Sequence, residues 1–207
     1  MIERVGVIDY GLANIRSVIN AINCFPVEVF VAECGSELES ADAVVLPGVG
    51  NFRSGMKALR ERNYEECLNK LVIEDGRPFL GICLGLHFLF DASEEGGESG
   101  LGWVEGTVRR FLETPENKVP HMGWNEVEID DSPCLFTDLE PPLDFYFAHS
   151  YHVPLEGVAE SIVTAVGNYG VPFVAALERD NLHAVQFHPE KSQLAGMKLL
   201  ENFLTVS

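Results

Sequence analysis

In the first half of the chain, short apolar runs alternate with segments in which apolar residues recur at helical spacing. The runs are rich in β-branched or aliphatic residues, are bounded by glycine or proline, and have the length of buried strands. They cover residues 5–8, 27–31, 43–46 and 78–82. The helical spacing joins Ile15, Val18, Ile19 and Ile22, then Met56 and Leu59, then Leu68, Leu71 and Val72. This alternation predicts a parallel sheet with helices on both faces.

After about residue 100 the pattern changes. Short strand-like runs follow one another without long helical patterns, at 104–111, 127–129, 145–153, 161–166, 173–177 and 183–187. We expect them to be antiparallel additions to the central sheet. An amphipathic helix with apolar positions Leu194, Met197, Leu200, Phe203 and Leu204 follows. The predicted fold is α/β, with an open, mostly parallel sheet and antiparallel strands in the C-terminal half, and residues 1–207 fit one domain.

The composition narrows the possible functions. With 14 Lys+Arg against 32 Asp+Glu the formal net charge is −18, so binding of nucleic acid through a basic face is not expected. The longest nearly apolar run, 78–90, is about half the length of a membrane span. The first residues lack the apolar stretch of a signal peptide. We therefore expect a soluble, cytoplasmic protein that binds neither nucleic acid nor membrane.

The residues that often bind metals do not form a metal site in this sequence. The five cysteines are widely spaced, which fits neither a disulfide framework nor a zinc site. Four of them are expected to be small buried hydrophobes, and Cys83 is the exception. The acidic stretch around Glu94, Glu95 and Glu98 is expected to be a solvated loop.

Cys83 lies in the segment Gly-Ile-Cys-Leu-Gly at 81–85, directly after an apolar strand and before a predicted helix. This is the cysteine version of a nucleophile elbow. The turn holds its central residue in a strained conformation and needs small neighbours where the chain packs closely. The N-terminus of the following helix favours the thiolate. The pattern predicts that Cys83 is a nucleophile.

His188, Pro189 and Glu190 follow the last predicted strand. The proline favours extended backbone at His188, so Glu190 can lie beside the imidazole. A carboxylate there accepts one ring N–H and leaves the other nitrogen free for the sulfur.

The segment Leu-Pro-Gly-Val-Gly at 46–50 also follows a strand. Backbone N–H groups of Gly48, Val49 and Gly50, together with that of Leu84, are candidates for an oxyanion hole. A phosphate-binding loop is less favoured because the Gly-Lys-Ser/Thr ending is missing. Cysteine, histidine, glutamate and an oxyanion loop at the carboxyl ends of strands together indicate acyl transfer through a thioester.

These residues resemble a known family. The segments 81–85 and 186–190 resemble the two signatures of the class I, triad-type glutamine amidotransferases. The segments 8–18, 46–52, 118–127, 146–151 and 185–193 resemble, in order, the glutaminase subunits of imidazole glycerol phosphate synthases.

The resemblance implies a function without a cofactor. L-Glutamine is hydrolysed to glutamate and ammonia, and the ammonia passes to a (β/α)₈-barrel cyclase subunit in a heterodimer that makes imidazole glycerol phosphate and aminoimidazole carboxamide ribotide for histidine biosynthesis. The glutaminase pattern takes up nearly all 207 residues, and a lone glutaminase would waste glutamine. We therefore expect the partner to gate the activity, with the loop 48–50 mispositioned until the partner carries its ligand.

The resemblance assigns a role to each matching residue. Cys83 is the nucleophile, His188 the general base and acid, and Glu190 the residue that orients His188. Gly48 and Val49 form the oxyanion site, while Ser150 and Tyr151 hold the amino-acid end of glutamine. The positions that face the cyclase and the ammonia tunnel are Asn14, Trp124, Tyr146 and Lys191.

Two residues depart from the family pattern. His87 replaces a glutamine near the substrate pocket, where it could charge near pH 6–7 and make substrate affinity depend on pH. Ala13 replaces a glycine in the turn before Asn14. These departures leave open a paralogous subunit that feeds another synthase, such as one acting on surface-polysaccharide sugars. A cysteine hydrolase or deglycase and a catalytically silent interaction subunit are further alternatives.

Overall fold

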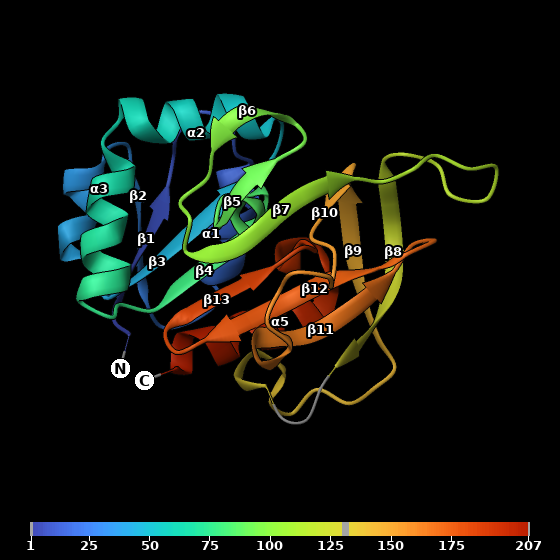
Figure 1. Ribbon diagram of the computed structural model, residues 1–207. Helices are drawn as coiled ribbons and strands as arrows, with labels where there is room; N and C mark the ends of the chain where they lie inside the picture. Colours follow the sequence, from blue (N-terminus) through green and yellow to red (C-terminus); the bar gives the residue numbers. More distant parts are fainter. Residues whose placement is uncertain (1, 130–132, 207) are drawn as a thin grey trace.

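The computed structural model describes residues 2–129 and 133–206. Its main sheet has nine strands within these residues (Figure 1). In spatial order they are β2 (Glu28–Ala32), β1 (Arg4–Ile8), β3 (Ala43–Gly48), β4 (Phe79–Cys83), β13 (Leu182–Val185), β12 (Pro172–Arg179), β11 (Val163–Asn168), β8 (His121–Ile129) and β9 (Leu143–His149). From β2 to β13 neighbouring strands are parallel, and from β13 to β9 they are antiparallel.

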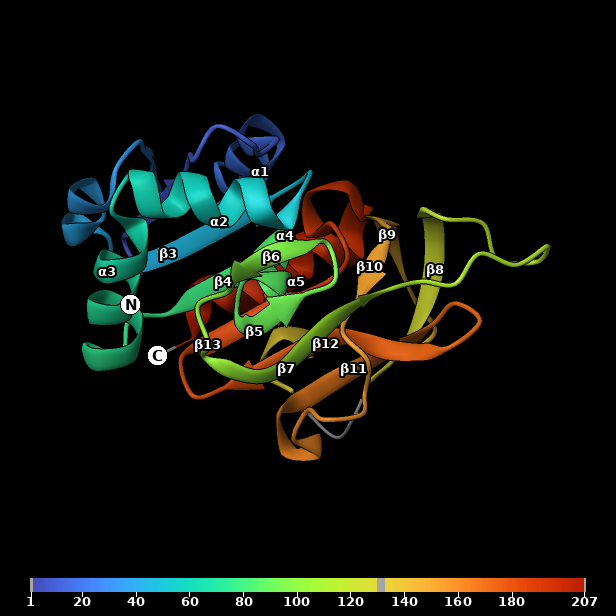
Figure 2. The same ribbon diagram turned by 45° about the horizontal axis from the view of Figure 1, so that its top comes forward.

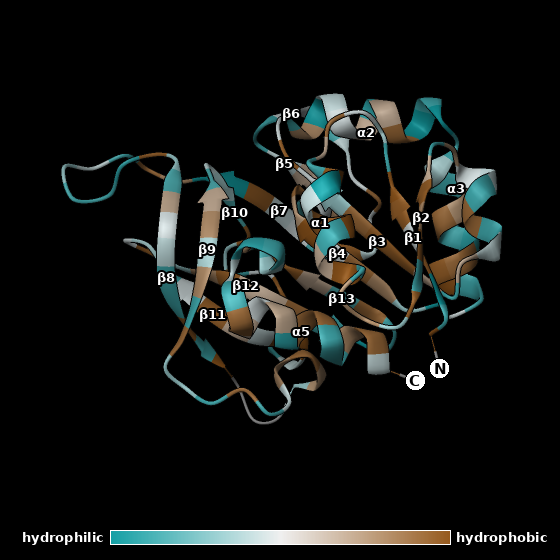
Figure 3. Ribbon diagram, turned by 180° about the vertical axis from the view of Figure 1, so that it is seen from behind, coloured by the Kyte–Doolittle hydropathy of each residue, from teal (hydrophilic) through white to brown (hydrophobic). Residues whose placement is uncertain are grey.

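Helices cover both faces of the parallel part. Helices α1 (Ile15–Ile22) and α5 (Gln193–Thr205) lie across the face seen in Figure 3, where the strands beneath them are mostly hydrophobic. Helices α2 (Phe52–Glu61) and α3 (Tyr64–Leu68), the latter continued by a π-helical segment at Asn69–Glu74, pack on the opposite face. The predicted α/β architecture is confirmed.

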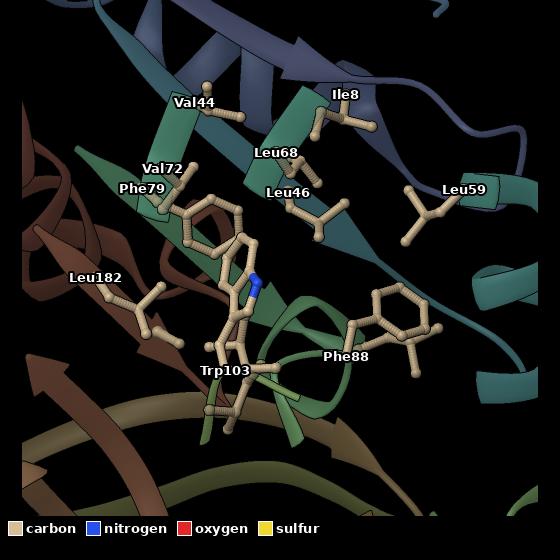
Figure 4. Close-up of a cluster of buried hydrophobic side chains, with 14 of the residues drawn as sticks. Ile8, Val44, Leu46, Leu59, Leu68, Val72, Phe79, Phe88, Trp103 and Leu182 are labelled. Atoms are coloured by element: carbon tan, nitrogen blue, oxygen red, sulfur yellow. The ribbon is translucent and has the colours of Figure 1, made fainter. Parts of the chain in front are cut away.

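Alternate residues of the strands supply two separate cores. In β3, Val44 and Leu46 belong to the core under α2 and α3, whereas Ala43 and Val45 belong to the core under α1 and α5. Figure 4 shows the first core, in which Trp103 packs edge-on against Phe79. Burial on both sides explains why these strands are continuous apolar runs in the sequence.

A second sheet corrects the prediction for the middle of the chain. Its strands are, in spatial order, β10 (Tyr151–His152), β7 (Val104–Arg110), β5 (Phe90–Ser93) and β6 (Gly96–Ser99), and β5 to β7 lie in front of the main sheet in Figures 1 and 2. The run 104–111 is therefore not an addition to the central sheet. The run 145–153 is not one strand either, because the chain passes from the main sheet to the second sheet at Ser150.

The predicted helix after Cys83 is present as α4 (Leu84–His87), a single turn, and β5 begins at Phe90. Two further expectations are wrong. The acidic stretch is a hairpin rather than a solvated loop, because Glu98 lies in β6 and its carboxylate is 3.2 Å from Arg60 Nη1. The cysteines other than Cys83 are not buried: Cys24 and Cys134 are exposed, and Cys34 and Cys67 are half-buried. No helix in the described part of the chain is long and apolar enough to cross a membrane.

Candidate active site

The candidate residues gather where three neighbouring parallel strands end. Gly48 at the end of β3 pairs with Cys83 at the end of β4. On the other side of β4, Val185 at the end of β13 pairs with Ile82. Elements that carry the oxyanion loop, the cysteine and the His-Pro-Glu segment are therefore adjacent, at the edge of the sheet where open α/β folds place their sites.

The backbone at Cys83 has the strained conformation predicted for an elbow. Its φ is 56° and its ψ is −104°, a conformation that costs energy for a residue with a side chain. A Cβ on Gly85 would collide with the Leu46 carbonyl, and one on Gly81 would lie 2.8 Å from the Gly85 carbonyl oxygen. The two flanking glycines are thus required by close packing around a nearly buried sulfur.

His188 and Glu190 form a buried pair next to this elbow. Extended backbone at His188 is followed by a 3₁₀ turn at Pro189–Lys191, which brings Glu190 Oε1 to 2.8 Å from His188 Nδ1. Their side chains are 4% and 2% exposed. Among the described residues, Nε2 of His188 has no hydrogen-bond acceptor or donor assigned.

The charges around His188 favour its protonated form. Burial alone would lower the pKa of His188, but the neighbouring Cys83 and Glu190 outweigh it and raise this pKa to about 10. Cys83 and His188 are therefore close enough to interact strongly. Such a pair supports a thiolate beside an imidazolium.

In the loop 48–50, predicted to form an oxyanion hole, one backbone N–H is engaged by another part of the chain. Gly48 fits tightly, since a Cβ there would lie 2.5 Å from Tyr10 Oη. The N–H of Val49, however, donates to the carbonyl oxygen of Leu12 at 3.1 Å, and the Val49 side chain is 38% exposed. Gly50 follows with φ +99°, which favours glycine. Leu84 begins α4, where backbone N–H groups have no acceptor within the helix.

His87 faces the interior of the site rather than solvent. Its Nε2 lies 2.7 Å from Oε1 of Gln186, and its side chain is 4% exposed. Burial lowers the pKa of His87 to about 4, although the bond to Gln186 opposes this. The expectation that His87 charges near pH 6–7 is therefore wrong.

Ser150 and Tyr151 connect the two sheets close to the sulfur. The Ser150 carbonyl accepts from the N–H of Phe111 at 3.0 Å, and Tyr151 begins β10. The carbonyl oxygen of Ala148, two residues before Ser150, is 4.0 Å from Cys83 Sγ. This segment thus borders the space in front of the cysteine.

The four positions predicted to face a partner include a contiguous group. The rings of Trp124 and Tyr146 meet edge-on with centroids 6.2 Å apart, and Lys191 Nζ lies 5.6 Å from the Tyr146 centroid. Trp124 is 48% exposed. Asn14 precedes α1, which contacts the turn that carries Lys191.

Two residues at the site were missed from the sequence. Gln186 is fully buried, and its Nε2 lies 3.8 Å from Cys83 Sγ. Tyr10 is 1% exposed, and its hydroxyl has no hydrogen-bond partner among the described residues. The only signal for Gln186 is its position directly before the Phe-His-Pro-Glu segment. The described residues also contain no group of three or more His, Cys, Asp or Glu that could hold a metal ion.

Comparison with known proteins places this geometry in a family. The profile "Glutamine amidotransferase class-I" matches residues 6–206. The chain belongs to the class I glutamine amidotransferases. Among the relatives of this amidotransferase, "Imidazole glycerol phosphate synthase subunit HisH 1" of Campylobacter jejuni (strain RM1221) is 43% identical, over 97% of this chain and 98% of the relative. The subunit HisH of Microcystis aeruginosa (strain NIES-843) is 44% identical over 97% and 94% of the two chains.

Solved structures support the fold of this amidotransferase. The structure titled "Structure of PurLQS from Thermotoga maritima" superposes with a TM-score of 0.76 at 19% identity, covering 99% of this chain and 98% of that one. A structure titled "Crystal structure of glutamine amidotransferase" gives a TM-score of 0.73 at 22% identity, covering 97% and 96%. At these identities the likeness concerns the fold alone.

Proposed function

We propose that this amidotransferase is the glutaminase subunit of an imidazole glycerol phosphate synthase. It acts as a single domain over residues 1–207, in the cytosol and without a cofactor. The relatives that are more than 40% identical over nearly the whole chain support the subunit assignment. The observation that carries the chemistry is the buried pair of His188 and Glu190 beside the strained Cys83.

The geometry supports amide hydrolysis in two halves. Cys83 Sγ attacks the carboxamide carbon of glutamine while His188 holds the thiol proton, which it then gives to the leaving nitrogen as ammonia departs. The product is a γ-glutamyl thioester on Cys83. Water attacks this thioester, His188 accepts one proton of the water and returns it to the sulfur, and glutamate leaves. Glu190 holds the ring of His188 so that Nε2 serves the sulfur throughout.

The oxyanion loop supports control by a partner. Each attack places negative charge on the carbonyl oxygen, and backbone N–H groups must lie close to that oxygen to stabilise it. The N–H of Val49 is instead bonded to Leu12. We infer that this peptide turns only in the active complex, so that Gly48, Val49 and Leu84 then surround the oxyanion, while Ser150 and Tyr151 hold the amino-acid end of glutamine.

The partner in this proposal is a (β/α)₈-barrel cyclase, bound as a heterodimer. The exposed group of Trp124, Tyr146 and Lys191, with Asn14 nearby, supplies aromatic and polar contacts of the kind enriched at interfaces. Ammonia passes from the cysteine through this face to the cyclase.

A paralogous subunit that feeds another synthase is the second candidate. Two substitutions favour it. His87, which is bonded to Gln186, stands where the family usually has glutamine, and Ala13 stands where the family has a glycine in the turn before Asn14.

One experiment separates these candidates. The chain is mixed with a histidine-pathway cyclase and its ribonucleotide substrate, and glutamate release is followed with and without that ribonucleotide. Ligand-dependent release that disappears in Cys83→Ala supports the proposal. Equal release by the isolated chain and the loaded complex contradicts the gating, and absence of stimulation by the cyclase favours the paralogue.

A further inference from the structure

The side chain of Gln186 bridges Cys83 and His87. Its Nε2 is 3.8 Å from Cys83 Sγ, and its Oε1 is 2.7 Å from Nε2 of His87. Gln186 is fully buried and His87 is 4% exposed. The backbone N–H of Gln186 donates to the carbonyl of Ala175 in β12 at 2.8 Å, which fixes the backbone of Gln186 against that strand.

The bond to His87 determines which way the amide of Gln186 points. A carbonyl oxygen can only accept, so the 2.7 Å contact requires a proton on Nε2 of His87. The NH₂ group of Gln186 is then directed at the sulfur. The reverse orientation would place the carbonyl oxygen against the thiolate, where both groups carry negative charge. Burial keeps His87 neutral at neutral pH, since its pKa is lowered to about 4.

We propose that Gln186 stabilises the Cys83 thiolate through its amide N–H, and that His87 is a positioning residue that fixes the orientation of this amide. The inference rests on the proposed function in one respect: that function supplies the reaction in which the sulfur of Cys83 takes part. The contact itself does not depend on which amide is cleaved.

Three groups interact with the Cys83 sulfur by charge or by hydrogen bonding. His188 pairs with it by charge, and the hydroxyl of Tyr10 lies near enough to feel its charge. Gln186 supplies a hydrogen bond to the ionised form, and such bonds are stronger than those between neutral groups. Loss of that bond removes this stabilisation, so the sulfur becomes a weaker nucleophile.

The test measures alkylation of Cys83 by iodoacetamide in the full chain, without glutamine or partner, at pH 5 to 10. Mass spectrometry of the Cys83 peptide gives the rate. We expect the pH midpoint of the Gln186→Leu reaction to lie about one unit higher, so that at pH values below both midpoints this variant reacts about tenfold more slowly than the parent chain. Gln186→Glu, which adds a carboxylate next to the sulfur, is expected to show a larger shift in the same direction.

A second pair of variants tests His87. His87→Phe removes the donor to Oε1, so the amide can reorient and the pH midpoint rises. His87→Gln retains an amide donor and is expected to restore the midpoint. A packing effect alone would not distinguish these variants by pH midpoint. His183→Gln is the matched control, because His183 is 3% exposed in β13, three residues before Gln186, and has no hydrogen bond to Gln186 or to the sulfur among the described residues.

The outcomes separate the inference from the proposed function. The inference is overturned if Gln186→Leu melts at the temperature of the parent chain and its alkylation has an unchanged pH midpoint. Equal pH midpoints for His87→Phe and His87→Gln also overturn it. In the complex, glutaminase kcat is expected to fall about tenfold in Gln186→Leu while KM changes less than about twofold. If the parent complex releases no glutamate but the midpoints shift as expected, the proposed function fails and the inference stands.

Discussion

The residues on the two sides of Cys83 differ in burial and in hydrogen bonding. On the base side, His188, Glu190 and Gln186 are buried and joined to each other or to the sulfur by short polar contacts. On the oxyanion side, Val49 is 38% exposed and its N–H is bonded to Leu12, which is itself 37% exposed.

This difference shows which part of the chemistry the chain can set up alone. Proton transfer needs a fixed imidazole, and burial between two strands fixes it. Anion stabilisation needs one peptide to turn, and a surface loop with glycine on both sides of Val49 can turn at low cost. Under the proposed function, such a subunit holds its nucleophile and base in place and depends on the partner to turn the Val49 peptide.

The largest effect is expected from the base side. His188→Asn removes the imidazole whose pKa the neighbouring Cys83 raises, and we expect glutaminase activity to fall on the order of 10⁴–10⁶-fold. The loss should be the same with and without the partner, because the base side does not depend on it. Glutamate release measures the loss, and His183→Asn is the control. A variant that regained activity when the partner was added would contradict this division.

The next effect concerns the orienting carboxylate. Glu190→Gln removes the charge that helps to raise the pKa of His188, so the imidazolium form is stabilised less. We expect activity to fall about 10²–10⁴-fold. The sign of the pH effect follows: His188 loses its proton at lower pH, and the pH midpoint of Cys83 alkylation moves upward. A midpoint that moves downward would show that Glu190 does not support the ion pair.

The oxyanion side should respond differently. Val49→Pro removes the N–H that we assign to the oxyanion in the active complex, and one such donor contributes about 10²–10³ in rate. The rate of the ligand-loaded complex is expected to fall by this factor, which lowers the ratio of stimulated to unstimulated activity. Alkylation of Cys83 should keep its pH midpoint, because the base side is intact. An unchanged ratio would exclude Val49 as the gated donor.

The sequence predicts the base side better than the oxyanion side for a physical reason. Continuous apolar runs specify these strands, which are buried on both faces, and the parallel register then places Gly48 beside Cys83 and β13 beside β4. The direction of one peptide has no such signature. The side chain of Val49 is the same whether its N–H points to Leu12 or into the site.

Two other features could not be predicted from local patterns. The break at Ser150 lies inside a continuous strand-like run, and only packing sends the next residues into the second sheet. The contact of His87 with Gln186 joins segments that are far apart in sequence, so the substitution at His87 could be noticed but its partner could not be deduced.

The smallest effect is expected on the free energy of unfolding at acid pH. Burial is the main cause of a lowered pKa at four histidines: His87 beside Gln186, with a pKa of about 4, His121, also about 4, and His149 and His152. Between about pH 6.5 and 4 the unfolded chain binds protons that the folded chain does not, so the free energy of unfolding falls as pH falls. Each such histidine contributes at most about 1.4 kcal/mol per pH unit.

Urea unfolding at pH 7, 6 and 5 measures this slope. His87→Gln removes one titrating group and should make the slope shallower by up to about 1.4 kcal/mol per pH unit, whereas Val49→Ala should leave it unchanged because the loop 48–50 carries no ionisable side chain. A stability that is flat over this range would mean that these histidines are hydrated in the folded chain, and that water reaches His87 beside Gln186 as readily as it reaches the exposed Val49.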